Sequence, residues 1–61
     1  MNIDKILMVD DDAHVRRVAE ISLRKLGKWK VTLACSGKEA LELAKSQTPD
    51  LIIMDLSMPE L

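Results

Sequence analysis

The sequence predicts an α/β fold, in which three parallel strands form a sheet in the order 2-1-3 with helices flanking it. Two short apolar runs, Lys5–Val9 and Leu51–Met54, lack alternation and are typical of strands buried on both faces. Between them, two helical patterns enclose a third short strand pattern, so the order is β-α-β-α-β. Short connections and right-handed crossovers favour a parallel sheet with the first strand in the middle.

An amphipathic helix is predicted to follow the first strand, from Asp12 to about Leu26. One face is apolar, and we expect it to lie on the sheet; it carries Val15, Val18, Ala19, Ser22 and Leu26. The opposite face carries Arg16, Arg17, Glu20 and Arg24. Asp12 can cap the first N–H groups, and Gly27 can adopt the left-handed conformation that ends a helix.

The segment Lys30–Ala34 alternates polar and apolar residues, which is typical of a half-exposed edge strand. Ser36 and Glu39 then form a capping box, in which each side chain is expected to accept a hydrogen bond from the other residue's backbone N–H. A second helix is predicted to run to about Gln47, because the residue before Pro49 avoids the helical region.

Length and composition limit the class of protein. Sixty-one residues allow one small domain, and a net charge of −1 gives no electrostatic argument for binding nucleic acid or an anionic membrane. The single cysteine, Cys35, allows no internal disulfide, and we expect it to be a partly buried, inert thiol. No signal peptide or membrane-spanning run is present, so we expect a soluble, cytoplasmic chain.

Carboxylates follow both apolar runs. Asp10 and Asp11 follow the first, and Asp55 follows the other. Ligands of open parallel sheets lie beyond the carboxyl ends of the strands, where these residues would meet. Two charges about 4 Å apart repel by roughly 4 kcal/mol at an effective dielectric constant of about 20. Either one carboxyl group stays protonated, or a hard divalent cation such as Mg²⁺ lies among the oxygens.

The residues Lys5 to Asp12 and Asp50 to Pro59 resemble the receiver domain of two-component response regulators. The resemblance implies a flavodoxin-like fold, of which residues 1–61 would be the N-terminal half. It implies phosphorelay signal transduction, in which a sensor histidine kinase or phosphotransfer protein phosphorylates Asp55. The implied Mg²⁺ ligands are Asp10, Asp11, Asp55 and the backbone carbonyl of Ser57. Such a domain is a phosphoacceptor and not a dedicated enzyme.

The family's later Ser or Thr and its Lys, which contact the phosphoryl group, belong to segments that these 61 residues do not contain. We therefore expect phosphotransfer to be impaired in this chain. Leu51–Met54 would also be an open edge strand, so a homo-oligomer paired through that edge is expected. A self-associating structural half-domain without phosphotransfer activity is the alternative. Nucleic acid would be contacted only through an effector domain that these residues do not include.

Plainer interpretations compete at several positions. Asp55 could simply be the first residue of a turn before Pro59. The role of Asp10 and Asp11 could be limited to a favourable interaction with a helix dipole. A calcium loop is not favoured, because Arg16 interrupts the ligand spacing. His14 is more typical of an exposed first helical turn than of a zinc ligand. A small metal-dependent hydrolase would share the acidic pocket, but no general base other than the carboxylates lies near Asp55 in the sequence.

Overall fold

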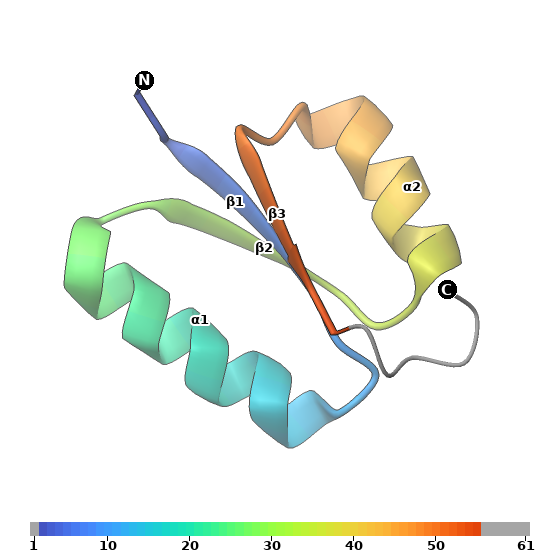
Figure 1. Cartoon of the computed structure of the whole chain (residues 1–61), viewed down its shortest axis with the longest axis horizontal. Coiled ribbons are helices and arrows are strands. Elements are labelled where there is room, and N and C mark those ends of the chain that lie inside the picture. Colours follow the sequence, from blue (N-terminus) through green and yellow to red (C-terminus); the bar gives the residue numbers. More distant parts are fainter. Residues whose placement is uncertain (1, 56–61) are drawn as a thin grey trace.

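The computed structural model describes residues 2–55, and Figure 1 shows their arrangement. The elements follow in the predicted order: β1 (Lys5–Val9), α1 (Ala13–Gly27), β2 (Lys30–Ala34), α2 (Gly37–Gln47) and β3 (Leu51–Met54). The three strands form one sheet, and α1 and α2 lie on its opposite sides (Figure 1). Neither helix of the described part is long and apolar enough to cross a membrane.

The sheet has the predicted order β2-β1-β3, and both pairings are parallel. Central β1 is the best buried strand, because Ile6, Leu7 and Val9 are at most 2% exposed. This agrees with its continuous apolar sequence, since a strand covered on both faces has no solvent side to make polar. The predicted half-exposed character of β2 is also confirmed. Lys30 is exposed and Thr32 and Leu33 are half-buried, whereas Val31 and Ala34 are buried.

The two faces of the sheet pack against different helices. Successive side chains of a strand point to opposite faces, so Leu7 and Val9 face α2 while Ile6 and Met8 face the other side. On the α2 face they form a cluster with Ala34 and with helix residues; its helical members are Ala40, Leu43 and Ala44. The small alanines let α2 approach the sheet closely.

Helix α1 meets the sheet with a face that only partly matches the predicted one: its half-buried residues are Arg16, Ala19, Glu20 and Leu23, and of the predicted apolar face only Ala19 is among them. Val15, Val18 and Leu26 are 41%, 52% and 79% exposed, so the apolar face points largely outward. Arg16 and Arg24 instead donate hydrogen bonds to the backbone carbonyls of Asp10 and Val31. The prediction was wrong because it assigned burial from apolarity alone, whereas these guanidinium groups satisfy carbonyls at the rim of the sheet.

The end of α1 also differs by one residue from the prediction. The helix includes Gly27, and the left-handed cap is Lys28, with φ of 57°. Gly27 is needed for a different reason. A Cβ atom there would lie 2.5 Å from ring atoms of Trp29, so only glycine allows this indole to pack against the last turn without a shift.

Helix α2 begins as predicted but with a modified capping arrangement. Ser36 caps it by accepting from the backbone N–H of Glu39 at 3.1 Å. The Glu39 carboxylate accepts from the backbone N–H of Cys35 at 2.7 Å, one residue earlier than the predicted reciprocal bond. Cys35 itself is exposed, so the expectation of a partly buried thiol was wrong. The helix ends at Gln47, where predicted.

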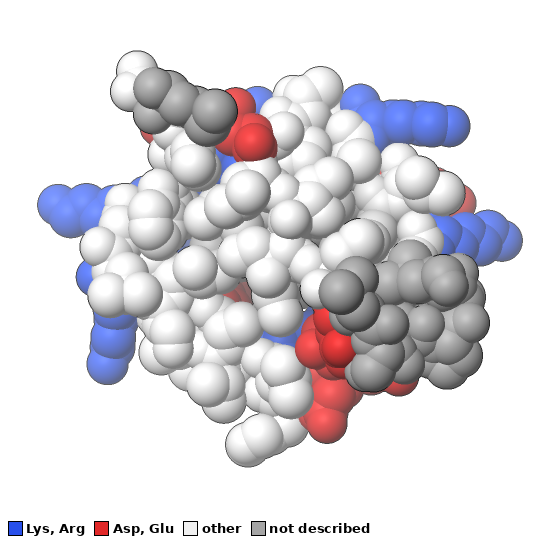
Figure 2. Space-filling model, viewed as in Figure 1, with Lys and Arg blue, Asp and Glu red and all other residues white. Residues whose placement is uncertain are grey.

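Strand β3 is the least covered part of the sheet. Its four side chains are between 36% and 45% exposed, as expected for an open edge. An open groove of about 420 Å³ separates β3 from α2; its lining is Gly37, Lys38, Ala40, Leu41, Ala44, Ile52 and Met54. Figure 2 shows that the face seen in this view is mostly uncharged, with basic side chains at its periphery.

We predict that Asp50 gives the fold part of its acid sensitivity. Its Oδ2 accepts from the backbone N–H groups of Asp4 and Lys5 at 2.9 and 3.0 Å, which ties the start of β3 to β1. These two bonds lower the pKa of Asp50 below 3.8. A depressed folded-state pKa stabilises the fold above the unfolded-state pKa, and this contribution is lost as pH falls through the folded-state value.

Asp50→Ala should therefore lower the urea midpoint at neutral pH, and the difference from wild type should narrow below about pH 4. Asp4→Asn is the matched control, because within residues 2–55 the Asp4 side chain makes no hydrogen bond at this junction. An equal pH dependence of wild type and Asp50→Ala would contradict this role.

Candidate functional site

Three carboxylates gather at the carboxyl-terminal edge of the sheet. Asp10 follows β1, Asp11 is the next residue, and Asp55 follows β3. One carboxylate oxygen from each lies within 4.8 Å of the others. Asp10 is buried, Asp55 is half-buried and Asp11 is exposed, so the cluster opens to solvent on one side. The predicted convergence is thus present, and Figure 2 shows acidic side chains gathered at one lower edge of this face.

Parallel strand pairing brings these residues together. Asp10 donates its backbone N–H to the carbonyl of Ala34 at 3.1 Å, which continues the pairing with β2. Asp55 donates its N–H to the carbonyl of Val9 at 3.1 Å, which continues the pairing with β1. Because Val9 is level with Met54 in this register, the residues that follow each strand begin at the same height.

The hydrogen bonds give the three consecutive aspartates different structural roles. Asp12 caps α1, since its Oδ1 accepts from the N–H groups of His14 and Val15 at 2.8 and 3.2 Å. Asp10 accepts the N–H of Asp12 at 2.9 Å, which shapes the turn into the helix. Among the described residues, no hydrogen bond or ion pair holds the Asp11 side chain. Helix capping therefore accounts for Asp12 and leaves Asp11 unexplained.

Sequence reasoning missed one residue at this edge. Arg16 was assigned to the solvent-facing side of α1, but it is half-buried and its Nη1 donates to the carbonyl oxygen of Asp10 at 2.8 Å. The only sequence signal is its place one helical turn after the capping Asp12, near the start of the helix. The pattern of charges in the sequence does not indicate which arginine donates a hydrogen bond to a backbone carbonyl.

The donor set suits a hard cation. Three carboxylates supply oxygen atoms only, and Mg²⁺ prefers oxygen ligands from one or two carboxylates together with water or phosphate oxygens. Two like charges this close repel, so a bound cation would offset the repulsion.

His14 donates its backbone N–H to Asp12 in the first turn of α1, as expected of a residue at that position. Ser57, the fourth expected ligand, lies outside the described residues.

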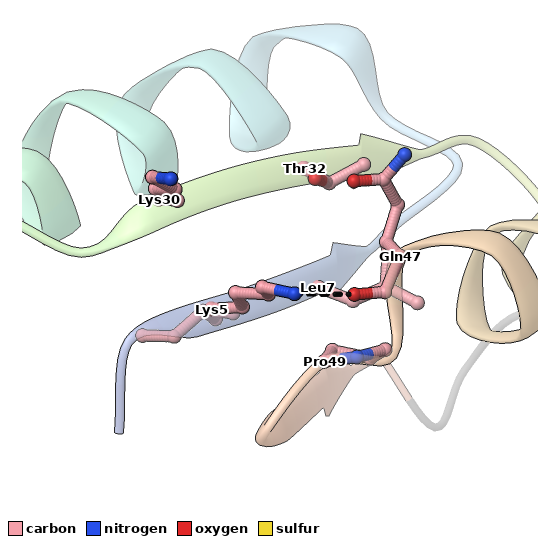
Figure 3. A pocket seen from close by; sticks show the side chains of 7 residues that line it. Lys5, Leu7, Lys30, Thr32, Gln47 and Pro49 are labelled. Carbon is pink, nitrogen blue, oxygen red and sulfur yellow. Dashed lines mark hydrogen bonds between the residues drawn. The ribbon is translucent and has the colours of Figure 1, made fainter. Parts of the chain in front are cut away.

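The opposite end of the sheet carries a pocket of about 230 Å³, seen in Figure 3. Its lining is Lys5, Ile6, Leu7, Lys30, Thr32, Gln47 and Pro49. Figure 3 shows Lys5 reaching toward the backbone carbonyl of Gln47, to which its Nζ donates at 3.3 Å. None of these residues is a carboxylate, histidine or cysteine, so within the described part the metal-binding chemistry lies at the acidic edge.

We predict that Asp11 and Asp12 have opposite effects on metal-free stability. Asp12→Ala should lower the free energy of unfolding by about 1 kcal/mol, because it removes the cap of α1. Asp11→Asn should leave it unchanged or raise it slightly, because this change removes a charge beside Asp10 and Asp55. Urea unfolding in a chelating buffer measures both. An equal loss in the two variants would contradict the division of roles.

Comparison with known proteins agrees with this geometry. The family model of the response regulator receiver domain matches residues 6–61. The chain is 43% identical over 61 residues to the probable transcriptional regulator ycf27 of Porphyridium aerugineum, covering all of this chain and 25% of that protein. It is 46% identical over 57 residues to the response regulator MprA of Mycolicibacterium vanbaalenii, covering 93% of this chain and 24% of that protein.

A third relative is the transcriptional regulatory protein AfsQ1 of Streptomyces coelicolor, 39% identical over 54 residues, with 88% of this chain and 24% of that protein covered. The chain thus spans about a quarter of the length of these curated relatives. The match of the family model extends over nearly all of the chain, and the parallel sheet in the order 2-1-3 with two helices is consistent with part of a flavodoxin-like receiver fold. The chain belongs to the response regulator receiver domain family of two-component signalling systems.

Proposed function

We propose that this chain acts in a phosphorelay, with Asp55 accepting a phosphoryl group from a sensor histidine kinase or a phosphotransfer protein. The observation that carries the proposal is the convergence of Asp10, Asp11 and Asp55 within 4.8 Å at the open edge of the sheet. Family membership supports the same chemistry. In this role the chain is a phosphoacceptor and not a dedicated enzyme.

Each carboxylate has a distinct proposed part. Asp55 is half-buried at the end of β3, where its backbone is fixed to Val9 and its carboxylate can meet an incoming group. Asp11 is exposed and has no bonding partner among the described residues, so it suits direct contact with Mg²⁺. Asp10 is buried and already accepts from the N–H of Asp12, so it would act partly through water. Ser57 would add a backbone carbonyl.

The transfer requires little covalent chemistry from the chain. A carboxylate oxygen of Asp55 forms a bond to phosphorus as the phosphorus–nitrogen bond of the donor phosphohistidine breaks. The leaving imidazole takes up a proton, and the product is an aspartyl phosphate. Bound Mg²⁺ would supply positive charge against the phosphoryl oxygens. Positioning and charge neutralisation are the main demands of phosphoryl transfer, and the parallel pairing that places Asp55 beside Asp10 and Asp11 supports the positioning.

We predict that acetyl phosphate with Mg²⁺ modifies the protein at Asp55. A Phos-tag gel should show a faint, slowly formed shifted band in wild type and none in Asp55→Asn, because asparagine lacks the nucleophilic carboxylate; rapid, complete modification of wild type would contradict poor acceptance by these residues alone. Asp4→Asn is the matched control, since Asp4 precedes β1 at the opposite end of the sheet and its side chain makes no hydrogen bond with the described residues. Asp11→Asn should reduce the modification strongly by weakening Mg²⁺ binding. Equal modification of wild type and Asp55→Asn would refute the proposal.

We also propose that residues 1–61 alone accept phosphate poorly and self-associate through β3. That strand pairs with β1 on one edge, and its side chains are 36% to 45% exposed. Covering them would contribute roughly 2 to 5 kcal/mol per copy, at about 1.5 to 3 kcal/mol for complete burial of each. No lysine or proline protects Leu51–Met54 from pairing with a second copy. An incompletely held β3 would also hold Asp55 loosely.

Sedimentation velocity should therefore show association that strengthens with concentration. Ile52→Lys, in the middle of β3, should shift the species toward monomer, because it places a charge on the proposed interface. Leu26→Lys is the matched control, since Leu26 is 79% exposed on α1, away from β3. Circular dichroism checks that both variants keep their helices. A monomer at every concentration would contradict self-association.

The partners and output of a longer protein are separate proposals. The relatives ycf27 and AfsQ1 are named as transcriptional regulators, and this chain corresponds to about a quarter of each. We propose that any contact with nucleic acid is made by other parts of such a protein, because residues 1–61 carry a net charge of −1. A cytoplasmic location fits both the family and the single unpaired cysteine.

A further inference from the structure

Two neighbouring arginines of α1 have different surroundings. Arg16 is half-buried, and its Nη1 donates to the carbonyl oxygen of Asp10 at 2.8 Å. Arg17 is exposed and makes no hydrogen bond or ion pair with the described residues. The two side chains have the same chemistry, so the bond to Asp10 follows from the position of Arg16 on the helix.

The Arg16 bond constrains the peptide group that joins Asp10 to Asp11. That group is planar, so a bond to its carbonyl oxygen restricts rotation of the plane and thereby the direction in which the chain enters Asp11. The Asp11 side chain has no bond of its own among the described residues. Its direction toward Asp10 and Asp55 therefore depends on the backbone at this peptide.

The other bonds of the turn act elsewhere. The N–H of Asp10 continues the pairing with Ala34, and the Asp10 carboxylate accepts from the N–H of Asp12. The first bond holds the backbone of Asp10, and the second holds the start of α1. Within residues 2–55, the Arg16 bond is the side-chain contact that reaches the carbonyl between the two acidic residues.

We propose that Arg16 is a positioning residue for the acidic cluster, which orients Asp11 to bind Mg²⁺ by clamping the Asp10–Asp11 peptide. This inference rests on the proposed function, because it concerns the same metal site. Charge alone makes the opposite prediction: a guanidinium beside the site repels a cation, so its removal should tighten Mg²⁺ binding. The sign of the change therefore separates positioning from simple electrostatics.

The test compares Arg16→Gln with Arg17→Gln in the full chain by calorimetric titration with Mg²⁺. Both variants change the net charge from −1 to −2, so long-range electrostatics changes equally. Arg16→Gln should weaken Mg²⁺ binding about tenfold, as is typical when a residue that orients a ligand is lost. Arg17→Gln should bind Mg²⁺ as tightly as wild type or slightly more tightly. Arg16→Lys should recover part of the loss, because an ammonium group can still donate to the carbonyl.

A metal-free measurement tests the clamp independently. Amide exchange followed by NMR should be faster at Asp12, whose N–H donates to the Asp10 carboxylate, in Arg16→Gln than in wild type or Arg17→Gln. Arg16→Met keeps the aliphatic stem, and it replaces Arg16→Gln with the same expected results if that variant does not fold.

Two results would overturn the inference: wild-type Mg²⁺ affinity and exchange in Arg16→Gln, or an equal loss of affinity in Arg17→Gln. If wild type itself does not bind Mg²⁺, the proposed metal site fails. The amide exchange of Asp12 then decides separately whether Arg16 holds the turn.

Discussion

The structure depends on the parallel pairing of β1 with a strand on each side. β1 is buried along Ile6 to Val9, and its register places Val9 level with both Ala34 and Met54. The pairing continues one residue further on each side, through the N–H groups of Asp10 and Asp55. Burial of an apolar strand therefore brings together carboxylates that are far apart in the sequence, and no loop has to be folded over the site to do so.

Three adjacent aspartates at one turn would repel one another unless each had a different interaction. Asp12 caps the N-terminus of α1, where a negative charge is favoured by the helix dipole and by the two backbone N–H groups that donate to its carboxylate. Asp10 accepts the N–H of Asp12 and lies buried beneath the turn. Asp11 remains exposed, beside both other members of the cluster. The local fold thus supports two of the charges and leaves one available to a cation.

Much of the fold was predictable because it is specified by short segments. β1 and β3 followed from apolar runs and β2 from alternation; α1 followed from its helical pattern and its Asp12 cap, and α2 from Ser36 and the Thr48-Pro49 stop. The order of the sheet followed from connection rules. The edge positions of Asp10, Asp11 and Asp55 then followed from the strands. Ser57 stays a prediction, as do the roles of the three carboxylates.

The orientation of α1 could not be predicted in the same way. Hydrophobic periodicity assumes that the most apolar face is the buried one. Here Arg16 and Glu20 are half-buried together with Ala19 and Leu23, and the exposed Arg24 reaches back to a carbonyl of β2. The two arginines bond to carbonyls, while Glu20 pairs with Arg24 at 3.3 Å. Whether an arginine reaches a carbonyl depends on the depth and rotation of the helix, which local sequence does not contain.

The exposed surfaces have a consequence for the site itself. Leu51 and Ile53 are level with Ile6 and Met8, so they lie on the α1 side, whereas Ile52 and Met54 line the groove beside α2. The strand that leads to Asp55 is thus incompletely covered on both faces, while the strand that leads to Asp10 is buried. Asp10 and Asp11 therefore follow the buried central strand, whereas Asp55 follows the exposed edge strand. Any segment or second copy that covers β3 would therefore also fix Asp55 relative to Asp10 and Asp11, which couples assembly at this edge to the geometry of the acidic cluster.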